Sequence, residues 1–403
     1  MTIRSTLRTV GPILGLQLVA SAATAQPYAY VTLKHSDAVT VIDTTTKTAV
    51  NSVDVGQSPS GVAVAPDGRW VFVANSNNRF NSVSVIDATT DTATADVRVG
   101  TNPLGVAVAP DGKRVYVTNP GSNSVSVITT ATNAVVATIA VGRSPADVAV
   151  TPDGAFVYVA NSQTFTSPAG GTVSVIDTAQ GKSVAAIPVG NNPFGVAVAP
   201  NGRFVYVTNS NSLDVPGPGS VSVIDTATNT VVTTVPVGGN PLGVAISPDS
   251  QVAYVTNFSS NSVSIIDAAT QHVVDTVHVG PGPLGIALTP DGRFAYVANR
   301  QPLNIIAPGT VSVIDTDSHA VVATIPVGDN PTSIAIATTS PPACLGDCNG
   351  DGTVSVDELI TGVDIVLGTV QPTACPAFDL NGDGAVTVAE LVSAVTAALD
   401  GCP

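Results

Sequence analysis

A pattern of apolar and polar positions recurs from residue 26 to about residue 338, and each copy has the same parts. In one copy, small apolar residues at 103–109 precede a Pro-Asp-Gly turn at 110–112. Alternating residues follow at 115–119 and 125–128, and a turn rich in Thr and Asn leads to a last segment that ends in Val-Gly. Alternation with a period of two indicates strands, so each copy predicts four strands joined by tight turns.

The spacing and number of the copies predict the architecture. The aromatic residue of the second strand recurs every 42 to 48 residues, a period typical of propeller blades with four strands each. Its seven occurrences are Tyr30, where Leu33 replaces the usual Asn, and Phe72, Tyr116, Tyr158, Tyr206, Tyr254 and Tyr296. Small residues in the first strand suit inner strands that converge on an axis. We therefore predict an all-β, seven-bladed β-propeller, followed by a small α-helical module.

The two ends of the repeat predict how the ring closes. The repeat begins near Tyr28 with a second strand and ends at 331–336 with a lone first strand. Together these two segments make one complete blade. Such a joint removes the open sheet edges that would otherwise favour aggregation.

Polar residues that recur in every copy are predicted to be structural. An Asn or Asp at the end of a strand hydrogen-bonds nearby backbone groups and fixes the turn. The recurring residues are Asn75, Asn119, Asn161, Asn209, Asn257 and Asn299, and Asp43, Asp87, Asp177, Asp225, Asp267 and Asp315. A binding site should instead break the regularity of the repeat.

Three blades depart from the regular repeat, because they have longer loops between the second and third strands, at 162–172, 210–220 and 300–310. These loops should share a face of the propeller with the Val-Gly-x-x-Pro crossings between blades. Loop drift on a tolerant surface is one explanation. A partner-binding face is the other, and its candidate residues are Arg79, Phe80, Arg143, Phe165, Phe258 and Arg300.

Two segments near the C-terminus, at 347–358 and 379–390, match the twelve-residue calcium loop D-x-N-x-D-G-x5-E. Hard oxygen ligands at this spacing suit Ca²⁺. The predicted ligands are Asp347, Asn349, Asp351, Thr353 through its carbonyl, Ser355 through water, and Glu358 in the first loop, and Asp379, Asn381, Asp383, Ala385, Thr387 and Glu390 in the second. The last residues of these two loops are the only glutamates in the chain, so we predict two bound Ca²⁺ ions.

An amphipathic helix is predicted after each calcium loop, because apolar residues recur at helical spacing from Leu359 and from Leu391. All four cysteines, Cys344, Cys348, Cys375 and Cys402, lie in the same region. In an exported chain they predict two disulfides, and three pairings are open. A metal–thiolate site is the alternative, but this region has no histidine or C-x-x-C motif.

The N-terminus has the order of a secretory signal peptide: Arg4 and Arg8, an apolar stretch at 13–20, and Ala-Thr-Ala at 23–25. An uncleaved membrane anchor is the alternative, but the stretch is shorter than a spanning helix needs. We expect cleavage after Ala25 and a secreted, cell-surface or periplasmic protein. The predicted organisation is a signal peptide at 1–25, the propeller at 26–338, a linker at 339–343 and the calcium module at 344–403.

The propeller repeat resembles the YVTN family of seven-bladed propellers from surface layers and cell surfaces. Tyr-Val-Thr-Asn at 116–119, 206–209 and 254–257 carries this resemblance. The duplicated loop and helix of the tail are similar to a dockerin, which implies docking to a cohesin. Here the twelfth loop position is Glu rather than the usual Asp, and positions ten and eleven are Val356-Asp357 and Val388-Ala389.

Charge and residue types narrow the function. The formal net charge is −15, and the tail from Cys344 has nine acidic residues and no basic ones, which argues against nucleic acid as a partner. The four histidines, His35, His272, His278 and His319, are expected away from the channel mouth, and no catalytic triad can be placed.

We therefore predict a non-catalytic interaction protein. Its partner would be a protein, cohesin-like among them, or a surface polysaccharide, with no membrane span in the mature chain. The alternative is a periplasmic or secreted lactonase-like propeller enzyme, which would need several acidic or His side chains converging from the inner strands.

Overall fold

The computed structural model describes residues 27–77, 81–162, 170–210, 218–300, 308–338, 346, 348, 354–372, 375–378 and 385–400. The chain forms two compact units, one spanning Ala25–Ser340 and the other containing Pro341–Pro403. Each unit is described by itself.

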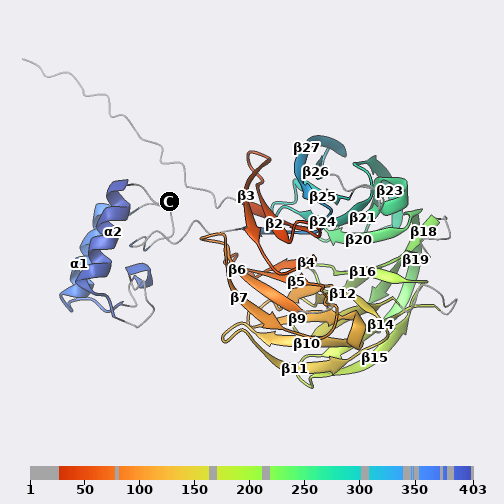
Figure 1. Ribbon diagram of the computed structural model, residues 1–403, viewed down its shortest axis with the longest axis horizontal. Helices are drawn as coiled ribbons and strands as arrows, with labels where there is room; N and C mark the ends of the chain where they lie inside the picture. The colour runs from red at the N-terminus through yellow and green to blue at the C-terminus, as the bar shows by residue number, and fades with distance from the viewer. Residues whose placement is uncertain are drawn as a thin grey trace, which may run out of the picture. The chain divides into compact units, whose positions relative to one another are not determined.

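Seven four-stranded antiparallel sheets form the larger unit, which confirms the predicted seven-bladed propeller (Figure 1). The closing blade is β28 (Pro331–Thr338), β1 (Pro27–Leu33), β2 (Ala38–Asp43) and β3 (Thr48–Asp54), from the inner to the outer strand. The next is β4 (Pro59–Val64), β5 (Trp70–Asn75), β6 (Ser82–Asp87) and β7 (Thr92–Arg98). Then come β8 (Val106–Val108), β9 (Arg114–Asn119), β10 (Ser124–Thr129) and β11 (Ala134–Ala140).

The other four blades follow in chain order. They are β12 (Pro145–Val150), β13 (Phe156–Asn161), β14 (Thr172–Asp177) and β15 (Lys182–Pro188), then β16 (Pro193–Val198), β17 (Phe204–Asn209), β18 (Pro218–Asp225) and β19 (Thr230–Gly239). The last two are β20 (Pro241–Ile246), β21 (Val252–Asn257), β22 (Ser262–Asp267) and β23 (His272–His278), and β24 (Pro283–Leu288), β25 (Phe294–Asn299), β26 (Pro308–Asp315) and β27 (Ala320–Asp329). Two 3₁₀ turns, η1 (Pro120–Ser122) and η2 (Phe258–Ser260), follow β9 and β21.

The ring closes where the two ends of the repeat meet, as predicted. Strand β1 pairs antiparallel with β28, so that Tyr30 lies opposite Ala335. The Thr32 hydroxyl donates to the Ser60 carbonyl of the next blade at 2.7 Å. The closing blade is therefore bonded both within itself and to its neighbour.

The hydrophobic core lies between neighbouring blades, because the second and third strands are apolar on both faces. One cluster joins Phe72 and Val83 of one blade to Val115, Val117 and Ile128 of the next. All of these side chains are buried. Face-to-face packing of this kind needs the small and β-branched residues that the repeat supplies.

Tyrosine hydroxyls of the second strands also bridge the blades. The Tyr158 hydroxyl donates to Oδ1 of Asn229 in the next blade at 2.7 Å, and burial raises the pKa of Tyr158 to about 12. Tyr296 reaches the closing blade in the same way, donating to the Thr44 carbonyl at 3.0 Å. Phe72 occupies this position in its own blade and has no hydroxyl to contribute.

The recurring Asn and Asp residues are structural, as predicted. Nδ2 of Asn119 donates to the Ser126 hydroxyl at 3.0 Å, and Oδ1 of Asp43 accepts the Thr45 backbone N–H at 2.7 Å. The glycine of six of the seven Val-Gly crossings lies against such an Asn, and that of the seventh, Gly328, lies against Leu33: a Cβ on Gly56 would come within 2.5 Å of Asn75 Cγ. The crossing therefore requires glycine.

The smaller unit contains α1 (Val356–Val366), η4 (Pro376–Phe378) and α2 (Val388–Asp400). The two predicted helices are present, but each begins at the tenth position of its predicted calcium loop, at Val356 and Val388, rather than after the loop. Phe378 is fully buried between them, and a Cβ on Gly362 would come within 2.5 Å of its ring. Among the residues described, no helix is long and apolar enough to cross a bilayer.

Candidate functional site

A cavity of about 290 Å³ lies where the seven inner strands begin, at one mouth of the central channel. Each blade contributes the two residues that follow the first proline of its inner strand. The first of the two is Leu104, Phe194, Leu242 or Leu284 in four blades, and Ser60, Ala146 or Thr332 in the others. The second is glycine in five blades, and Asp147 or Ser333 in the remaining two. The cavity is thus partly apolar, with polar groups at few points.

Glycine predominates at the second position because neighbouring backbones approach closely there. A Cβ on Gly195 would lie 2.2 Å from the Leu242 carbonyl oxygen, and one on Gly61 would lie 2.3 Å from the Leu104 oxygen. A Cβ on Gly105 would lie 2.8 Å from Oδ1 of Asp147. Because Gly105 has no side chain, it leaves room for the carboxylate of Asp147, the one acidic residue among the described residues that line the cavity.

The Asp147 carboxylate is held by backbone N–H groups. Oδ2 accepts the Val196 N–H of the next blade at 3.1 Å. Burial raises the pKa of Asp147 to about 6, although the hydrogen bonds from Val196 and Val148 act in the opposite direction. A carboxyl with this pKa can hold or release a proton close to neutral pH, which is the property required of a general acid or base.

Lys34 and Arg300 form the positive part of the cavity lining. They are the residues that follow β1 and β25, in adjacent blades, and both are partly buried. Burial lowers the pKa of each, and the Arg300 charge lowers that of Lys34 further. Nε of Arg300 is buried without a hydrogen-bond partner. Neither residue takes part in the ion pairs found in the described part of the chain, which are Arg69–Asp87 and His319–Asp275.

The positive and negative groups lie across the channel from each other. Inner strands contact in the order β24, β28, β4, β8, β12, β16, β20 and back to β24. The Asp147 blade is therefore three blades from the Lys34 blade in one direction, and three from the Arg300 blade in the other. In a ring of seven this is the largest possible separation.

The structure places one of the predicted binding residues, Arg300, in this cavity. Phe258 lies close to it, since a Cβ on Gly282 would meet both the Arg300 carbonyl and the Phe258 ring. Arg143 is exposed and does not line the cavity. Arg79, Phe80 and Phe165 lie outside the described residues.

Asp147, Lys34 and Ser333 were not predicted from the sequence. The first strand of each copy was expected to carry small apolar residues, which is wrong at Asp147. The sequence does carry a signal for Asp147, because five other blades have glycine at the same place in a Pro-x-Gly pattern. The prediction considered only long loops as departures from the repeat.

The histidines were placed correctly in three cases. His272 and His278 lie on the outer strand β23, and Nδ1 of His319 is 2.8 Å from Asp275 Oδ2 at the edge of the neighbouring blade. His35 differs from the prediction, because it directly follows Lys34 in the turn at the mouth of the channel. Its exposed ring lies 3.2 Å from Asn330 Nδ2 and does not line the cavity.

In the tail, the structure describes Ser355, Glu358, Ala385, Thr387 and Glu390 of the predicted calcium ligands. The others, Asp347, Asn349, Asp351, Thr353, Asp379, Asn381 and Asp383, lie outside the described residues. Both glutamates are buried, at 7% and 6% exposed. A buried carboxylate in a region without basic residues calls for a cation or for several hydrogen bonds.

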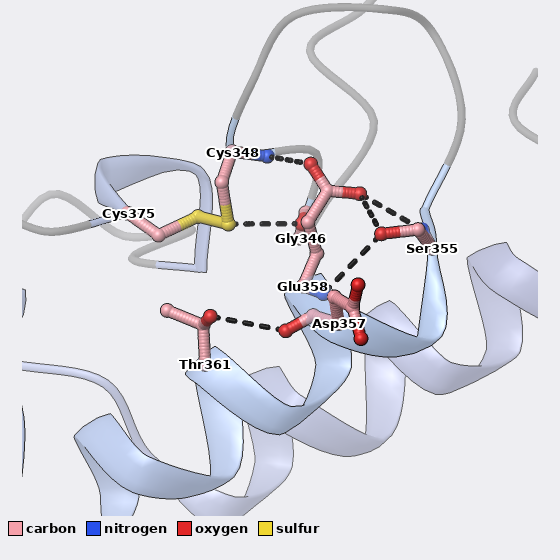
Figure 2. The surroundings of a disulfide bond; sticks show 7 residues. All are labelled: Gly346, Cys348, Ser355, Asp357, Glu358, Thr361 and Cys375. Atoms are coloured by element: carbon pink, nitrogen blue, oxygen red, sulfur yellow. Dashed lines mark hydrogen bonds between the residues drawn. A yellow bond between two sulfur atoms is a disulfide. The ribbon is translucent and has the colours of Figure 1, made fainter.

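The two glutamates are held alike. Oε2 of Glu358 accepts the backbone N–H and the hydroxyl of Ser355, both at 2.8 Å (Figure 2). Oε2 of Glu390 accepts the same two groups of Thr387, at 2.7 and 2.9 Å. Each helix is thus preceded by a Ser or Thr whose hydroxyl accepts the backbone N–H of a Glu three residues later, while the Glu carboxylate accepts the backbone N–H of that Ser or Thr. This arrangement is a capping box.

A disulfide joins Cys348, within the first predicted calcium loop, to Cys375, with their Cα atoms 4.9 Å apart (Figure 2). The Cys348 backbone N–H donates to Glu358 Oε1 at 2.8 Å. The backbone at Cys348 is therefore held both by the disulfide and by its hydrogen bond to Glu358. Cys344 and Cys402 are outside the described residues, and no cluster of metal-binding side chains occurs within the described part.

These features define a seven-bladed propeller with a partly apolar central cavity that carries a few charged groups, and a helical module. Family models agree with this class of protein: a YNCE-like beta-propeller matches residues 18–157, and a cytochrome D1 heme domain matches residues 159–283. An EF-hand model matches residues 377–395, which include the second predicted calcium loop. No curated protein matches the chain.

Solved structures share the propeller. Hydrazine synthase of Kuenenia stuttgartiensis is 25% identical, with a TM-score of 0.64, over 76% of this chain and 99% of its own. A functionally unknown protein from Desulfotomaculum acetoxidans is 17% identical, with a TM-score of 0.64, over 77% and 98%. Dihydro-heme d1 dehydrogenase NirN, in complex with DHE, is 19% identical, with a TM-score of 0.56, over 77% and 75%.

The prediction that the protein is not an enzyme is wrong in the light of these matches. The cytochrome D1 heme domain and hydrazine synthase point to enzyme-like or heme-processing proteins. Sequence analysis looked for a local catalytic motif or a set of His and acidic residues. The polar groups of this cavity come one by one from separate blades, so no local motif marks them.

The described cavity lining lacks what a heme requires. Heme iron is held by His, Cys, Met or Tyr side chains. None of the described residues that line the cavity is of these types. Its volume of about 290 Å³ also lies at the lower end of small-molecule sites. The described lining therefore does not fit a heme, and it suits a small organic molecule better.

Proposed function

We propose that the propeller is an exported enzyme that hydrolyses a small ester or lactone in its central cavity. The observation that carries this proposal is Asp147, a carboxyl with a pKa raised to about 6 that faces two cationic side chains across the channel. Strongly shifted groups in a cavity are typical of active sites. The same cavity gives the lactonase-like alternative a site in this chain.

The proposed chemistry uses the two sides of the cavity differently. Water adds to the ester carbonyl, and Lys34 and Arg300 stabilise the negative charge that develops on the carbonyl oxygen. Protonated Asp147 donates its proton to the oxygen that leaves as an alcohol. The proton lost by the attacking water restores the acid. The guanidinium of Arg300, which is partly buried and lines the cavity, supplies hydrogen-bond donors for such an anion.

The test is hydrolysis of a panel of five- and six-membered lactones and p-nitrophenyl acetate by the mature protein. Asp147→Asn should lower kcat by roughly 10²- to 10⁴-fold, the usual range for general acid–base catalysis. Asp177→Asn, at the end of β14 and outside the cavity lining, is the matched control and should leave the rate unchanged. The proposal fails if no substrate is hydrolysed above buffer, or if Asp147→Asn is as active as wild type.

We further propose that the tail binds two Ca²⁺ ions through the two loops and attaches the enzyme to a surface partner, cohesin-like or polysaccharide. Support comes from the EF-hand match, and from two buried glutamates that are positioned alike. The leader pattern and the disulfide support export, because disulfides persist in oxidising compartments.

Calorimetric titration of the whole protein with Ca²⁺ tests this proposal. The wild type should bind two ions, and Glu358→Gln with Glu390→Gln should lose both, since a Gln cannot bind bidentately as a carboxylate. Two ions bound by the double variant would refute the assignment. Binding of a candidate partner should also disappear in chelator.

A further inference from the structure

The charge distribution of the central cavity suggests what kind of molecule fits it. The cationic pair Lys34 and Arg300 lies on one side, and Asp147 lies across the channel. Apolar side chains from four other positions, Leu104, Phe194, Leu242 and Leu284, line the space between. A ligand that satisfies all three regions has an anionic end, an apolar middle and a hydrogen-bond donor at its other end.

We propose that the cavity binds an aliphatic hydroxycarboxylate, and that the corresponding lactone is the substrate. This inference rests on the proposed hydrolase function, because opening a lactone produces a carboxylate and a hydroxyl on one chain. The carboxylate meets the guanidinium of Arg300, which lines the cavity and takes part in no ion pair within the described residues, and the hydroxyl donates to Asp147. The apolar chain lies against Phe194 and the leucines, and a sugar acid would leave its extra hydroxyls unpaired there.

The repeat itself offers matched variants. Five other blades carry glycine at the position of Asp147, so Asp147→Gly restores the pattern of the repeat and suits the local backbone. Asp177→Asn, at the end of β14 and away from the cavity lining, is the control, because it changes a carboxyl group without touching the proposed binding site. Arg300→Gln removes the cation and keeps a side chain of similar reach.

The experiment is calorimetric binding of 5-hydroxypentanoate, pentanoate and gluconate to the mature protein and the three variants. We expect 5-hydroxypentanoate to bind roughly tenfold tighter than either of the other acids, the value of one hydrogen bond to a charged group. Asp147→Gly should remove this advantage and leave pentanoate affinity unchanged. Arg300→Gln should weaken both aliphatic acids, and Asp177→Asn should change neither.

The outcomes separate this inference from the hydrolase proposal. Equal affinity for pentanoate, or tighter binding of gluconate, overturns the inference even when lactones are hydrolysed. Tight, Asp147-dependent binding of 5-hydroxypentanoate supports it even when no lactone turns over, in which case only the hydrolase proposal fails. If none of the acids binds and no lactone is hydrolysed, both fail.

Discussion

Replacing Asp147 by Asn should make the folded propeller more stable at neutral pH. The pKa of this carboxyl rises from 3.8 to about 6 on folding, chiefly through burial. At 1.36 kcal/mol per unit, the charged form costs about 3 kcal/mol of folding free energy above pH 6. An Asn is neutral, and its side-chain oxygen can still accept the Val196 N–H. The variant should therefore recover up to about 3 kcal/mol at pH 7.

The sign of the pH dependence follows from the direction of the shift. The folded state binds the proton more tightly than the unfolded state, so the wild type is most stable below the unfolded pKa and loses stability as the pH rises through about 6. The advantage of Asp147→Asn should thus vanish near pH 4 and reach its full size above pH 6.

Urea unfolding at pH 4, 5, 6 and 7 measures this difference, with the fluorescence of Trp70 as the probe. Trp70 is the only tryptophan and lies in β5 of the propeller, so it does not report on the tail. Asp267→Asn is the control: hydrogen bonds from Thr270 lower the pKa of Asp267, so this variant should be less stable at neutral pH. A variant Asp147→Asn that is less stable than wild type at pH 7, or a difference that does not depend on pH, would refute the reasoning.

Three other predictions concern the rate, the blades and the tail. Hydrolysis should decrease as the pH rises above about 6, because the acid form of Asp147 is the proton donor; a pH–rate profile measures this, and a flat profile contradicts it. Tyr158→Phe should lower the free energy of unfolding by about 1 kcal/mol through loss of its bond to Asn229, whereas Tyr116→Phe, whose hydroxyl has no such bond, should matter less. Reducing the Cys348 disulfide should weaken Ca²⁺ binding, because the same segment donates to Glu358; unchanged affinity after reduction would exclude this coupling.

The fold could be predicted well from the sequence because one repeat unit occurs seven times along the chain. Each copy carries its own turn residues and its own alternation of apolar and polar positions. A wrong strand assignment in one copy is therefore corrected by comparison with the other copies. The closure by β1 and β28 followed from where the pattern starts and stops. The disulfide pairing did not follow, since it depends on how the tail segments pack around Phe378 rather than on cysteine spacing.

The cavity was harder to predict because its polar groups are far apart in the chain. The charged residues come from three different blades, and they line one cavity only when the ring of blades is closed: they are Lys34, Asp147 and Arg300. No local spacing links them. Arg300 was found because it flanks a long loop, whereas Lys34 was hidden in the one blade that is split between the two ends of the repeat.

The cost of Asp147 itself argues for a function. Glycine occupies the same position in five blades, where it lets neighbouring backbones approach closely and carries no charge. An aspartate there is desolvated, and it requires Gly105 beside it for space. Where a protein breaks the local rules of its own fold, the departure is expected at a functional or strained site. A single costly carboxylate across the channel from two cations that form no ion pair within the described residues is therefore better explained by a ligand than by drift of the repeat.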